Sequence, residues 1–458
     1  MNLFTHQKEG VEFLKKRAGA ILGDEMGLGK TRQAIVALGR VSDHLNVIVC
    51  PASLKLNWER EIKMVYPEDE VYVDGDIIGF LESNAAWLVV NYDQLKKWGG
   101  VLIEKKYCLV GDEAHYIKGR SLRSRLFLKL ADEAERVYLL TGTPILNRPI
   151  ELYNLLKAIK HPITKTKRTG KDNWWGFALR YCGAHRITLG NTGKSFLDIR
   201  GATHLDELKE KISDSFLRRT KDKVLDLPPK IEQMILIELS KDWQKKYDSA
   251  FDDYIKFLRD NPIEGKIIDN VILARHLVEI QKLKQVCSEA KIDAIKEDVE
   301  SMLDASESVV IFTQYRQTLK TLVSAFPGSV SIDGSDSMES RQEAVDLFQS
   351  GASRVFIGNI KAAGIGITLT RSSNVVFADL DWTPAVHDQA ADRCHRIGQT
   401  GTVNVRYYVT RGTIEEDIME MLDKKRKIIE KVLAGDDSKS ETMGVKELVG
   451  RISARVDK

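Results

Sequence analysis

The sequence predicts an α/β fold of two doubly wound parallel-sheet lobes with a helical insertion between them. Two observations support this prediction. Short apolar runs alternate with amphipathic stretches from residue 20 to about residue 159, and the same alternation returns after residue 308. Apolar runs separated by helical periodicity are typical of parallel strands that are buried on both faces. The length of 458 residues also exceeds what one ordinary core accommodates.

The strands of each lobe are expected at its apolar runs. In lobe one these are residues 20–22, 46–50, 87–91, 107–111 and 136–140, and in lobe two they are residues 308–313, 329–333, 354–358, 374–378 and 403–408. Residues 240–300 are rich in Lys, Glu, Asp and Leu without a strand-like run, so we expect helices there. Residues 161–215 interrupt the alternation with a basic loop and the pair Trp174-Trp175, which indicates an insertion into lobe one.

These features divide the chain into consecutive parts. Lobe one is expected at residues 1–230, with its insertion at about 161–215. A helical linker follows at 231–292, lobe two at 293–435, and a weakly packed polar tail at 436–458.

Composition narrows the class of protein. No apolar run reaches the roughly 18 residues that a membrane span requires, and no signal-peptide pattern opens the chain. The 5 cysteines lack CxxC spacing, which argues against a disulfide framework or a zinc site and favours a reducing compartment. We therefore expect a cytoplasmic protein, or a nuclear one if the source is eukaryotic. The compactness of the chain indicates a bacterial or viral origin, and we expect a monomer. The net charge of +3 neither demands nor excludes a nucleic-acid partner.

A glycine-rich segment has the context of a phosphate-binding loop. Gly27, Gly29, Lys30 and Thr31 follow an expected strand and open an expected helix. Glycines let backbone N–H groups approach phosphates, the lysine pairs with the outer phosphates, and the threonine hydroxyl can hold Mg²⁺. The pattern departs from the strict form at one point, because Asp24 stands where the first glycine belongs.

Two carboxylates complete this candidate site. Asp112 and Glu113 come immediately after the expected strand 107–111, in the same lobe as the lysine loop. Asp112 can hold Mg²⁺ through water, and Glu113 can orient and deprotonate the attacking water. An ordinary acidic loop is the alternative for these residues alone, but together with the lysine loop they indicate nucleotide hydrolysis.

At this point the sequence resembles the Swi/Snf group of superfamily 2 helicase-like ATPases, over nearly the whole chain. The segments that carry the resemblance are 24–31, with its aspartate, 140–144, 216–220 followed by 227–230, 361–370, and above all 389–399. The resemblance implies two RecA-like lobes, ATP and Mg²⁺ as cofactors, and movement on double-stranded or branched DNA. Segments 180–182, 206–208 and 362–369 resemble the annealing-helicase and fork-remodelling branch.

The resemblance also implies roles for single residues. Gln7 would recognise adenine, and His115, Thr141, Thr143 and Gln389 would couple hydrolysis to movement. The expected DNA contacts are Ser53, Asn91, Thr313, Gln314 and Trp382, although Trp382 could equally belong to the core of lobe two. Thr383 departs from the asparagine that is usual in the family.

Arg393 and Arg396 are the candidate arginine fingers of lobe two. On an expected helix they are one turn apart and share a face, from which they could stabilise the transferring phosphoryl group. The basic loop around Lys165 to Lys171 is open between DNA contact and solvated surface. The Trp174-Trp175 pair favours packing over a stacking wedge.

The leading function is therefore an ATP-dependent DNA translocase acting in fork remodelling or branch migration. A strand-separating helicase and the motor subunit of a larger DNA-processing assembly are the alternatives, and a nucleotide-binding scaffold without turnover is a third.

Overall fold

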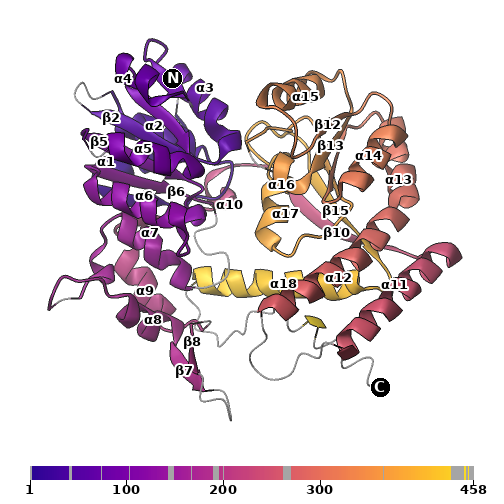
Figure 1. Cartoon of the computed structure of the whole chain (residues 1–458). Coiled ribbons are helices and arrows are strands. Elements are labelled where there is room, and N and C mark those ends of the chain that lie inside the picture. The colour runs from indigo at the N-terminus through magenta and orange to yellow at the C-terminus, as the bar shows by residue number, and fades with distance from the viewer. Residues whose placement is uncertain are drawn as a thin grey trace. The chain divides into compact units, whose positions relative to one another are not determined.

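The computed structural model resolves the chain into two compact units, which Figure 1 shows by colour along the sequence. We call them lobe one, mainly Met1–Asp226, and lobe two, mainly Leu227–Lys427. The structure describes residues 3–40, 44–73, 75–102, 104–142, 149–166, 168–188, 195–199, 201–260, 270–364, 366–434, 448, 449 and 452.

Lobe one is built on a 7-stranded parallel sheet with the order β3-β4-β2-β5-β6-β1-β9. All the strands expected from the sequence are present, which confirms the parallel α/β prediction: β1 (Gly19–Leu22), β2 (Leu45–Cys50), β4 (Trp87–Asn91), β5 (Tyr107–Asp112) and β6 (Arg136–Leu140). Two short edge strands were not predicted, β3 (Val71–Val73) and β9 (Phe216–Leu217). They lack the long apolar run of a central strand.

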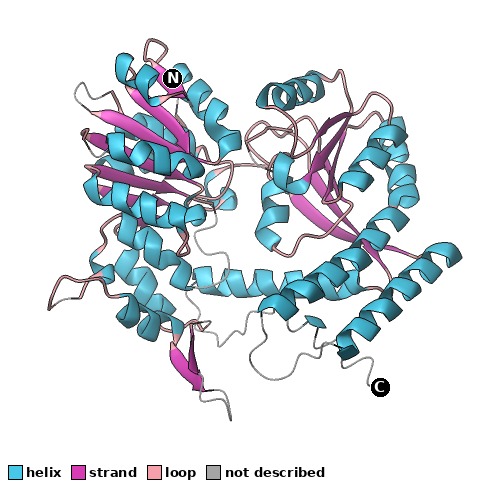
Figure 2. Cartoon of the chain, in the orientation of Figure 1, coloured by secondary structure: helices cyan, strands magenta, loops and turns pink. Residues whose placement is uncertain are grey.

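Helices lie between these strands in the chain (Figure 2). Lobe one contains α1 (Thr5–Lys15), α2 (Lys30–Leu38), α3 (Lys55–Val65), α4 (Ile77–Glu82), α5 (Leu95–Leu102), α6 (Leu122–Glu133), α7 (Leu152–Ala158) and α10 (Lys221–Val224). Ser121 determines where α6 begins, because its hydroxyl accepts a hydrogen bond from Ser124 N at 3.3 Å and caps the helix. The apolar faces of several helices and one face of the sheet form a core that includes Trp98 and Phe127.

The insertion in lobe one has its own small structure. It contains α8 (Trp174–Cys182), an antiparallel hairpin of β7 (His185–Thr188) and β8 (Ser195–Asp198), and α9 (Leu205–Ile212). Both of its ends meet β1. A Cβ atom on Gly19 would lie 2.4 Å from Ile159 O at the entrance, and at the exit Ile21 N donates to Ser215 O at 2.8 Å.

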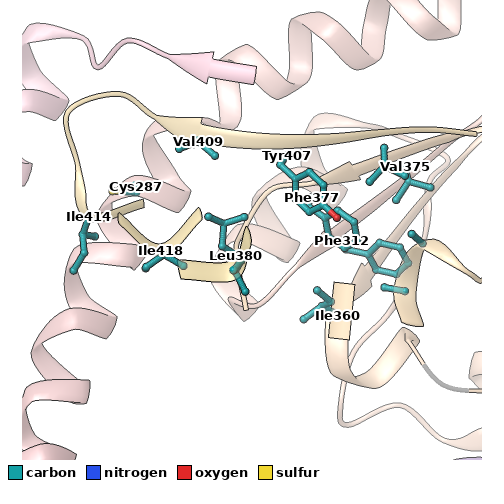
Figure 3. Packing of buried hydrophobic residues seen from close by; sticks show 14 of the residues in the cluster. Cys287, Phe312, Ile360, Val375, Phe377, Leu380, Tyr407, Val409, Ile414 and Ile418 are labelled. Atoms are coloured by element: carbon teal, nitrogen blue, oxygen red, sulfur yellow. The ribbon is translucent and has the colours of Figure 1, made fainter. Parts of the chain in front are cut away.

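Lobe two is built on a 6-stranded parallel sheet with the order β10-β15-β14-β11-β13-β12. The expected strands form as β11 (Val309–Thr313), β12 (Val330–Ile332), β13 (Val355–Asn359), β14 (Asn374–Phe377) and β15 (Val403–Thr410). Their core contains the stacked rings of Phe312, Phe377 and Tyr407 (Figure 3), with centroid distances of 5.5 Å and 5.0 Å between successive rings.

One strand of this sheet corrects the expected linker. β10 (Lys230–Ile237) pairs in parallel with β15, although residues 231–292 were expected to be helical. Its side chains are mostly exposed because it is an edge strand, and its apolar run, residues 234–237, was overlooked in the prediction. The remainder of that segment is helical in the described residues, with α11 (Lys241–Asp260) and α12 (Asn270–Ala290).

The other helices of this part of the chain are α13 (Ile292–Asp304), α14 (Arg316–Ala325), α15 (Met338–Ser350), α16 (Ile360–Ala363), α17 (Pro384–Ala391) and α18 (Ile414–Ala434). Leu448, Val449 and Ile452 are buried in the core of lobe two. A weakly packed polar tail would not bury these side chains. Among the helices of the described residues, none has the length and apolar character needed to cross a membrane.

A buried ion pair joins three parts of lobe two. Lys291, between α12 and α13, and Glu415, at the start of α18, are both fully enclosed, and Lys291 Nζ lies 2.7 Å from Glu415 Oε1. The lysine also donates to Tyr408 O at 2.9 Å, and Thr410 N donates to Glu415 Oε2 at 2.9 Å. Burying these charges is tolerable because each polar group has a partner.

Lys291→Met is therefore expected to destabilise lobe two by about 3–5 kcal/mol, since it leaves an uncompensated buried carboxylate. Urea unfolding followed by circular dichroism measures this loss. Lys296→Met is the control, because Lys296 makes only a half-exposed pair with Glu300 at 3.7 Å and its loss should cost less than about 1 kcal/mol. Equal stability of the two variants would contradict the expected cost.

Candidate functional site

The candidate nucleotide site lies where three neighbouring strands of lobe one end. β5, β6 and β1 are adjacent in the sheet and parallel. Their carboxyl ends therefore open on the same edge, which is where α/β sheets bind ligands. The glycine-rich loop follows β1, Thr141 follows β6, and Asp112 ends β5. The sheet thus gathers segments that are far apart in the sequence.

The glycine-rich loop has the backbone that its sequence predicts. Gly27 and Gly29 have φ angles of 84° and 73°, in the left-handed region that favours glycine. Gly29 is the N-cap of α2, so Lys30 and Thr31 form the first turn of that helix. The helix N-terminus directs free N–H groups and positive potential towards the loop, as an anion site requires.

Gln7, the residue expected to recognise adenine, lies against this loop. A Cβ atom on Gly29 would be 2.3 Å from Gln7 Nε2, so only glycine allows this approach. The Gln7 side chain also accepts a hydrogen bond from Phe4 N at 3.1 Å, which fixes it at the start of α1.

The Lys30 ammonium is held inside the loop. Its Nζ donates to Asp24 O at 2.8 Å and to Glu25 O at 3.2 Å. Burial lowers the pKa of Lys30, while the negative charges of Glu113, Asp24 and Asp112 oppose that shift. The lysine thus lies within electrostatic reach of both carboxylates that the sequence assigned to the same site.

Two hydrogen bonds hold the Asp112 carboxylate. Trp58 Nε1 donates to Asp112 Oδ2 at 2.8 Å, and Glu113 N donates to Oδ1 at 2.9 Å. Burial and the neighbouring Glu113 carboxylate raise the pKa of Asp112 to about 6, against the effects of Trp58 and Lys30. A divalent cation would relieve this repulsion between the two carboxylates, so the residues present fit an Mg²⁺ ion.

Glu113 adopts a left-handed conformation, with φ of 48°, which is uncommon for a residue other than glycine. Its Oε2 lies 3.2 Å from His115 Nδ1. Strained backbone of this kind clusters at functional sites. His115, the first of the expected coupling residues, is therefore in direct contact with the candidate base.

The end of β6 reaches the same loop. Thr141 is fully buried, and its N–H donates to Leu22 O at 3.1 Å. A Cβ atom on the next residue, Gly142, would lie 2.6 Å from Met26 Cγ and 3.5 Å from Lys30 Nζ. The expected coupling segment therefore touches the phosphate loop, although Thr143 itself lies outside the described residues.

Sequence reasoning missed the partner of Asp24. Arg219 Nε donates to Asp24 Oδ1 at 3.0 Å, and Arg219 Nη2 lies 2.5 Å from Oδ2. The two residues are 195 positions apart, so no local pattern could connect them. The unusual aspartate of the loop is thus half of an ion pair.

The arginines of lobe two require a correction. α17 ends at Ala391, so Arg393 and Arg396 lie in the turn that follows and do not share a helix face. The Arg393 carbonyl accepts from Leu369 N at 2.8 Å, and Arg396 Nη1 donates to Thr368 Oγ1 at 3.0 Å. The turn is thereby attached to the segment after α16.

Two neighbours support this turn. Gln399 Nε2 donates to Ser372 O at 2.8 Å, and its Oε1 accepts from Gly401 N at 2.9 Å. Gln389, an expected coupling residue on α17, accepts from Arg393 Nε through its carbonyl at 3.1 Å. The most specific sequence motif therefore folds as one hydrogen-bonded unit.

Most of the predicted DNA contacts in lobe two are engaged within the protein. Thr313 is fully buried and its hydroxyl donates to Asp379 Oδ2 at 2.5 Å, so a DNA contact by its side chain does not fit. Gln314 Nε2 donates to Asp381 Oδ2 at 2.8 Å. Trp382 packs partly buried against the core, with Lys284 Nζ 4.8 Å from its ring centroid. The core interpretation of Trp382 agrees with this packing.

In lobe one the expected DNA contacts lie beside each other in the sheet. Ser53 follows β2 and Asn91 ends β4, and these strands are neighbours. Asn91 Oδ1 accepts from Asp93 N and Gln94 N at 3.1 Å and 3.0 Å, so its amide caps the next turn. Ser53 is partly exposed in a short 3₁₀ helix.

The two neighbouring tryptophans of the insertion, Trp174 and Trp175, have different environments. Trp174 packs against the core of lobe one, and the Arg120 guanidinium lies 4.8 Å from its ring centroid. Trp175 is 52% exposed. In the basic loop Lys165 pairs with Asp172 at 3.1 Å, while Arg168 and Lys171 are exposed. Packing therefore accounts for one tryptophan and not for the other.

The two segments of the insertion singled out in the sequence meet at one glutamate. Arg180 Nε and Tyr181 OH donate to Glu207 at 3.0 Å and 3.1 Å, and Lys211 also bonds it. These donors lower the pKa of Glu207 to about 2, with Arg180 as the largest cause. α8 and α9 are thereby joined.

Two family models match the chain one after the other. The SNF2-related domain family matches residues 6–292, and the helicase conserved C-terminal domain family matches residues 290–398. The chain is 35% identical to the DNA annealing helicase and endonuclease ZRANB3 of Bos taurus, over 95% of this chain and 41% of that protein. It thus spans about two fifths of that relative.

Other relatives differ in length and source. A SWI/SNF-related matrix-associated actin-dependent regulator of chromatin subfamily A-like protein 1 homolog of Caenorhabditis elegans is 31% identical, over 95% of this chain and 62% of that protein. An uncharacterized ATP-dependent helicase of Mycoplasma pneumoniae is 30% identical, over 98% of this chain and 44% of that protein. The SWI2/SNF2 ATPase core of Sulfolobus solfataricus, solved in complex with dsDNA, is 25% identical with a TM-score of 0.43, over 98% of this chain and 96% of that one.

Proposed function

Because the chain belongs to the SNF2-related domain family, we propose that it is a DNA-dependent ATPase that uses Mg²⁺ and moves along double-stranded or branched DNA. The observation that supports this proposal best is the meeting of Lys30, Asp112 and Glu113 at one edge of the lobe-one sheet, within electrostatic reach of one another. A lysine in a glycine-rich loop beside two carboxylates is the arrangement that phosphoryl transfer to water requires.

Each residue has a distinct role in the proposed hydrolysis. The backbone N–H groups of Gly27 to Thr31 and the Lys30 ammonium bind the outer phosphates. Asp112 and the Thr31 hydroxyl would hold Mg²⁺, which when bound neutralises charge on the β and γ phosphates. Glu113 orients the attacking water and accepts its proton. His115 contacts the Glu113 carboxylate through Nδ1 and positions it.

Lobe two would supply the remaining positive charge. In the proposed mechanism Arg396 and Arg393 stabilise the negative charge on the transferring phosphoryl group, and their turn is held by Gln399 and by the segment of Thr368. Each stage of ATP hydrolysis would set a different state of the motor, and the cycle of states would drive movement on DNA. Contacts to phosphates rather than bases suit a motor that moves over any sequence.

The proposed substrate class is forked or branched DNA. ZRANB3 is named as a DNA annealing helicase, and the segments that meet at Glu207 are those that resemble this branch. The role would be fork remodelling or branch migration in replication, recombination or repair.

Forked duplexes are accordingly expected to stimulate ATP hydrolysis more than single strands of equal length, because the motor grips duplex DNA. Phosphate release with matched concentrations of single-stranded, duplex and forked DNA measures this order. Fork regression and unwinding of plain duplexes are then compared with the same protein. Stimulation by single strands alone would contradict the proposal.

A strand-separating helicase is the second candidate, and the exposed ring of Trp175 is the observation that favours it. An exposed aromatic side chain four residues from the exposed Lys171 could stack on a base at a junction. Efficient unwinding of long plain duplexes, without preference for forks, would favour this candidate over remodelling.

A further inference from the structure

The segment that leaves lobe one runs alongside the phosphate loop. β9 pairs in parallel with Ile21 and Leu22 of β1. This ladder continues past the ends of the strands, because Gly23 N donates to Leu217 O at 2.7 Å and Glu25 N donates to Arg219 O at 2.9 Å. The first half of the phosphate loop is therefore an extension of the sheet, held in place by residues 216–219.

Side chains reinforce this pairing in both directions. Arg218 Nη1 donates to Gly23 O at 3.1 Å and to Gly142 O at 3.2 Å, so it joins the loop to the end of β6. On the other side, Lys221 N donates to Glu25 Oε2 at 2.7 Å. We call residues 216–221 the exit segment. Arg218, Arg219 and Lys221 of this segment each form a hydrogen bond with the phosphate loop.

Arg219 is the centre of this arrangement. Besides the bonds of its side chain to Asp24, its own N–H donates to Asp24 Oδ1 at 3.1 Å. Its Nη2 donates to Gln33 Oε1 of α2 at 3.0 Å, and its Nη1 bonds His6 O of α1. One guanidinium thus joins the loop to the helix on each side of it in the sequence.

The charge of Asp24 explains why such a partner is needed. The carboxylate is fully buried in a loop whose proposed ligand is a triphosphate, so it would repel the ligand and pay a large desolvation cost without a cation. The glycine usual at this position would need no partner. The aspartate therefore makes the loop depend on an arginine from the exit segment, which continues along the chain into lobe two at Leu227.

We propose that the Asp24–Arg219 pair is a positioning element that makes the ATP-competent form of the phosphate loop depend on the exit segment, so that events in lobe two or on DNA reach the nucleotide through the chain itself. The inference rests on the proposed function and adds a route of regulation to the same site. Arg219 acts through Asp24 and the loop and does not need to touch the nucleotide.

The test uses the full chain and removes both charges together. Asp24→Asn/Arg219→Gln leaves one uncharged amide on each side chain and removes the ion pair, so no uncompensated charge is left in the core. Arg219→Gln alone leaves the Asp24 charge buried and should lower the melting temperature, which the double variant should largely restore. Arg136→Gln is the control, because Arg136 is an exposed lobe-one arginine at the amino end of β6, opposite the edge that holds the loop, and donates to Lys15 O at 3.1 Å.

For each variant we measure the melting temperature, the KM for ATP, and kcat with and without duplex DNA. The folded double variant is expected to lose about tenfold in the ratio of DNA-stimulated to basal kcat, a loss of typical size for coupling between two sites. Arg136→Gln should keep the wild-type ratio. A merely structural role would lower the melting temperature and leave this ratio unchanged.

Two results would overturn the proposal. One is a double variant of wild-type stability that keeps the wild-type ratio. The other is an equal fall of basal and stimulated kcat, which would mean that the pair only braces the loop. A wild-type protein without any DNA stimulation would instead contradict the proposed function, so the two failures are distinguishable.

Discussion

Glu113→Gln is expected to bind ATP and Mg²⁺ and to hydrolyse almost none of it. The amide cannot accept the proton of the attacking water, and loss of a general base typically costs about 10²–10⁴ in rate. Binding should persist because Asp112, Thr31 and Lys30 remain. Nucleotide affinity by equilibrium titration and DNA-stimulated phosphate release, on one preparation, measure the two effects separately.

Lys30→Ala gives the complementary result. Because Lys30 would pair with the outer phosphates, its loss should weaken ATP binding as well as abolish turnover. Glu135→Gln is the matched control for Glu113→Gln, since Glu135 also belongs to lobe one but is half exposed and pairs with His44 away from the loop. Normal turnover in Glu113→Gln would show that another group activates the water and would overturn the assignment.

Arg396→Ala is expected to bind ATP and DNA nearly as the wild type does while losing almost all turnover. An arginine finger acts mainly in the transition state and contributes roughly 10³–10⁵ in rate in related enzymes. The structure also offers a bracing role, because Arg396 Nη1 donates to Ile367 O at 3.3 Å and to Thr368 Oγ1. Arg393→Ala is expected to behave in the same way.

Melting temperature separates these two roles. If Arg396 only braces its turn, the variant should be less stable and should keep appreciable turnover per folded molecule. Arg354→Ala is the control, since Arg354 is an exposed lobe-two arginine that donates to Leu303 O at 2.9 Å. A stable Arg396→Ala protein that retains most of its kcat would exclude the finger role.

The central strands of both sheets could be predicted from the sequence because burial on both faces leaves long apolar runs. β10 was missed although it contains the apolar run 234–237, because that run follows the expected end of lobe one and leads into a helical segment rich in Lys and Asp. The helix expected through Arg393 and Arg396 ends at Ala391, because Arg393 N donates to Ala390 O at 3.1 Å and the Arg393 side chain takes the Gln389 carbonyl. The Arg393 carbonyl in turn accepts from Leu369 N, in a distant segment that no local periodicity reports.

In the candidate site too, local patterns predicted some residues, whereas contacts between distant segments could not be predicted. Motif spacing was sufficient to select Lys30, Asp112 and Glu113, because their chemistry is bound to short local patterns. Motif spacing could not predict the Asp24–Arg219 ion pair. Each residue stands out in the sequence by itself, as an aspartate in place of a glycine and as an arginine before the expected end of lobe one. Only the pairing of β9 with β1 brings these residues together.

The attachment of the insertion to β1 makes it a replaceable module. Its entrance at Ile159 and its exit at Ser215 meet the same strand two residues apart, at Gly19 and Ile21. The free energy of closing a loop between two fixed anchors grows only slowly with its length. Lineages could therefore lengthen, shorten or exchange this excursion, and with it the exposed Trp175, while the register of the motor sheet stays the same.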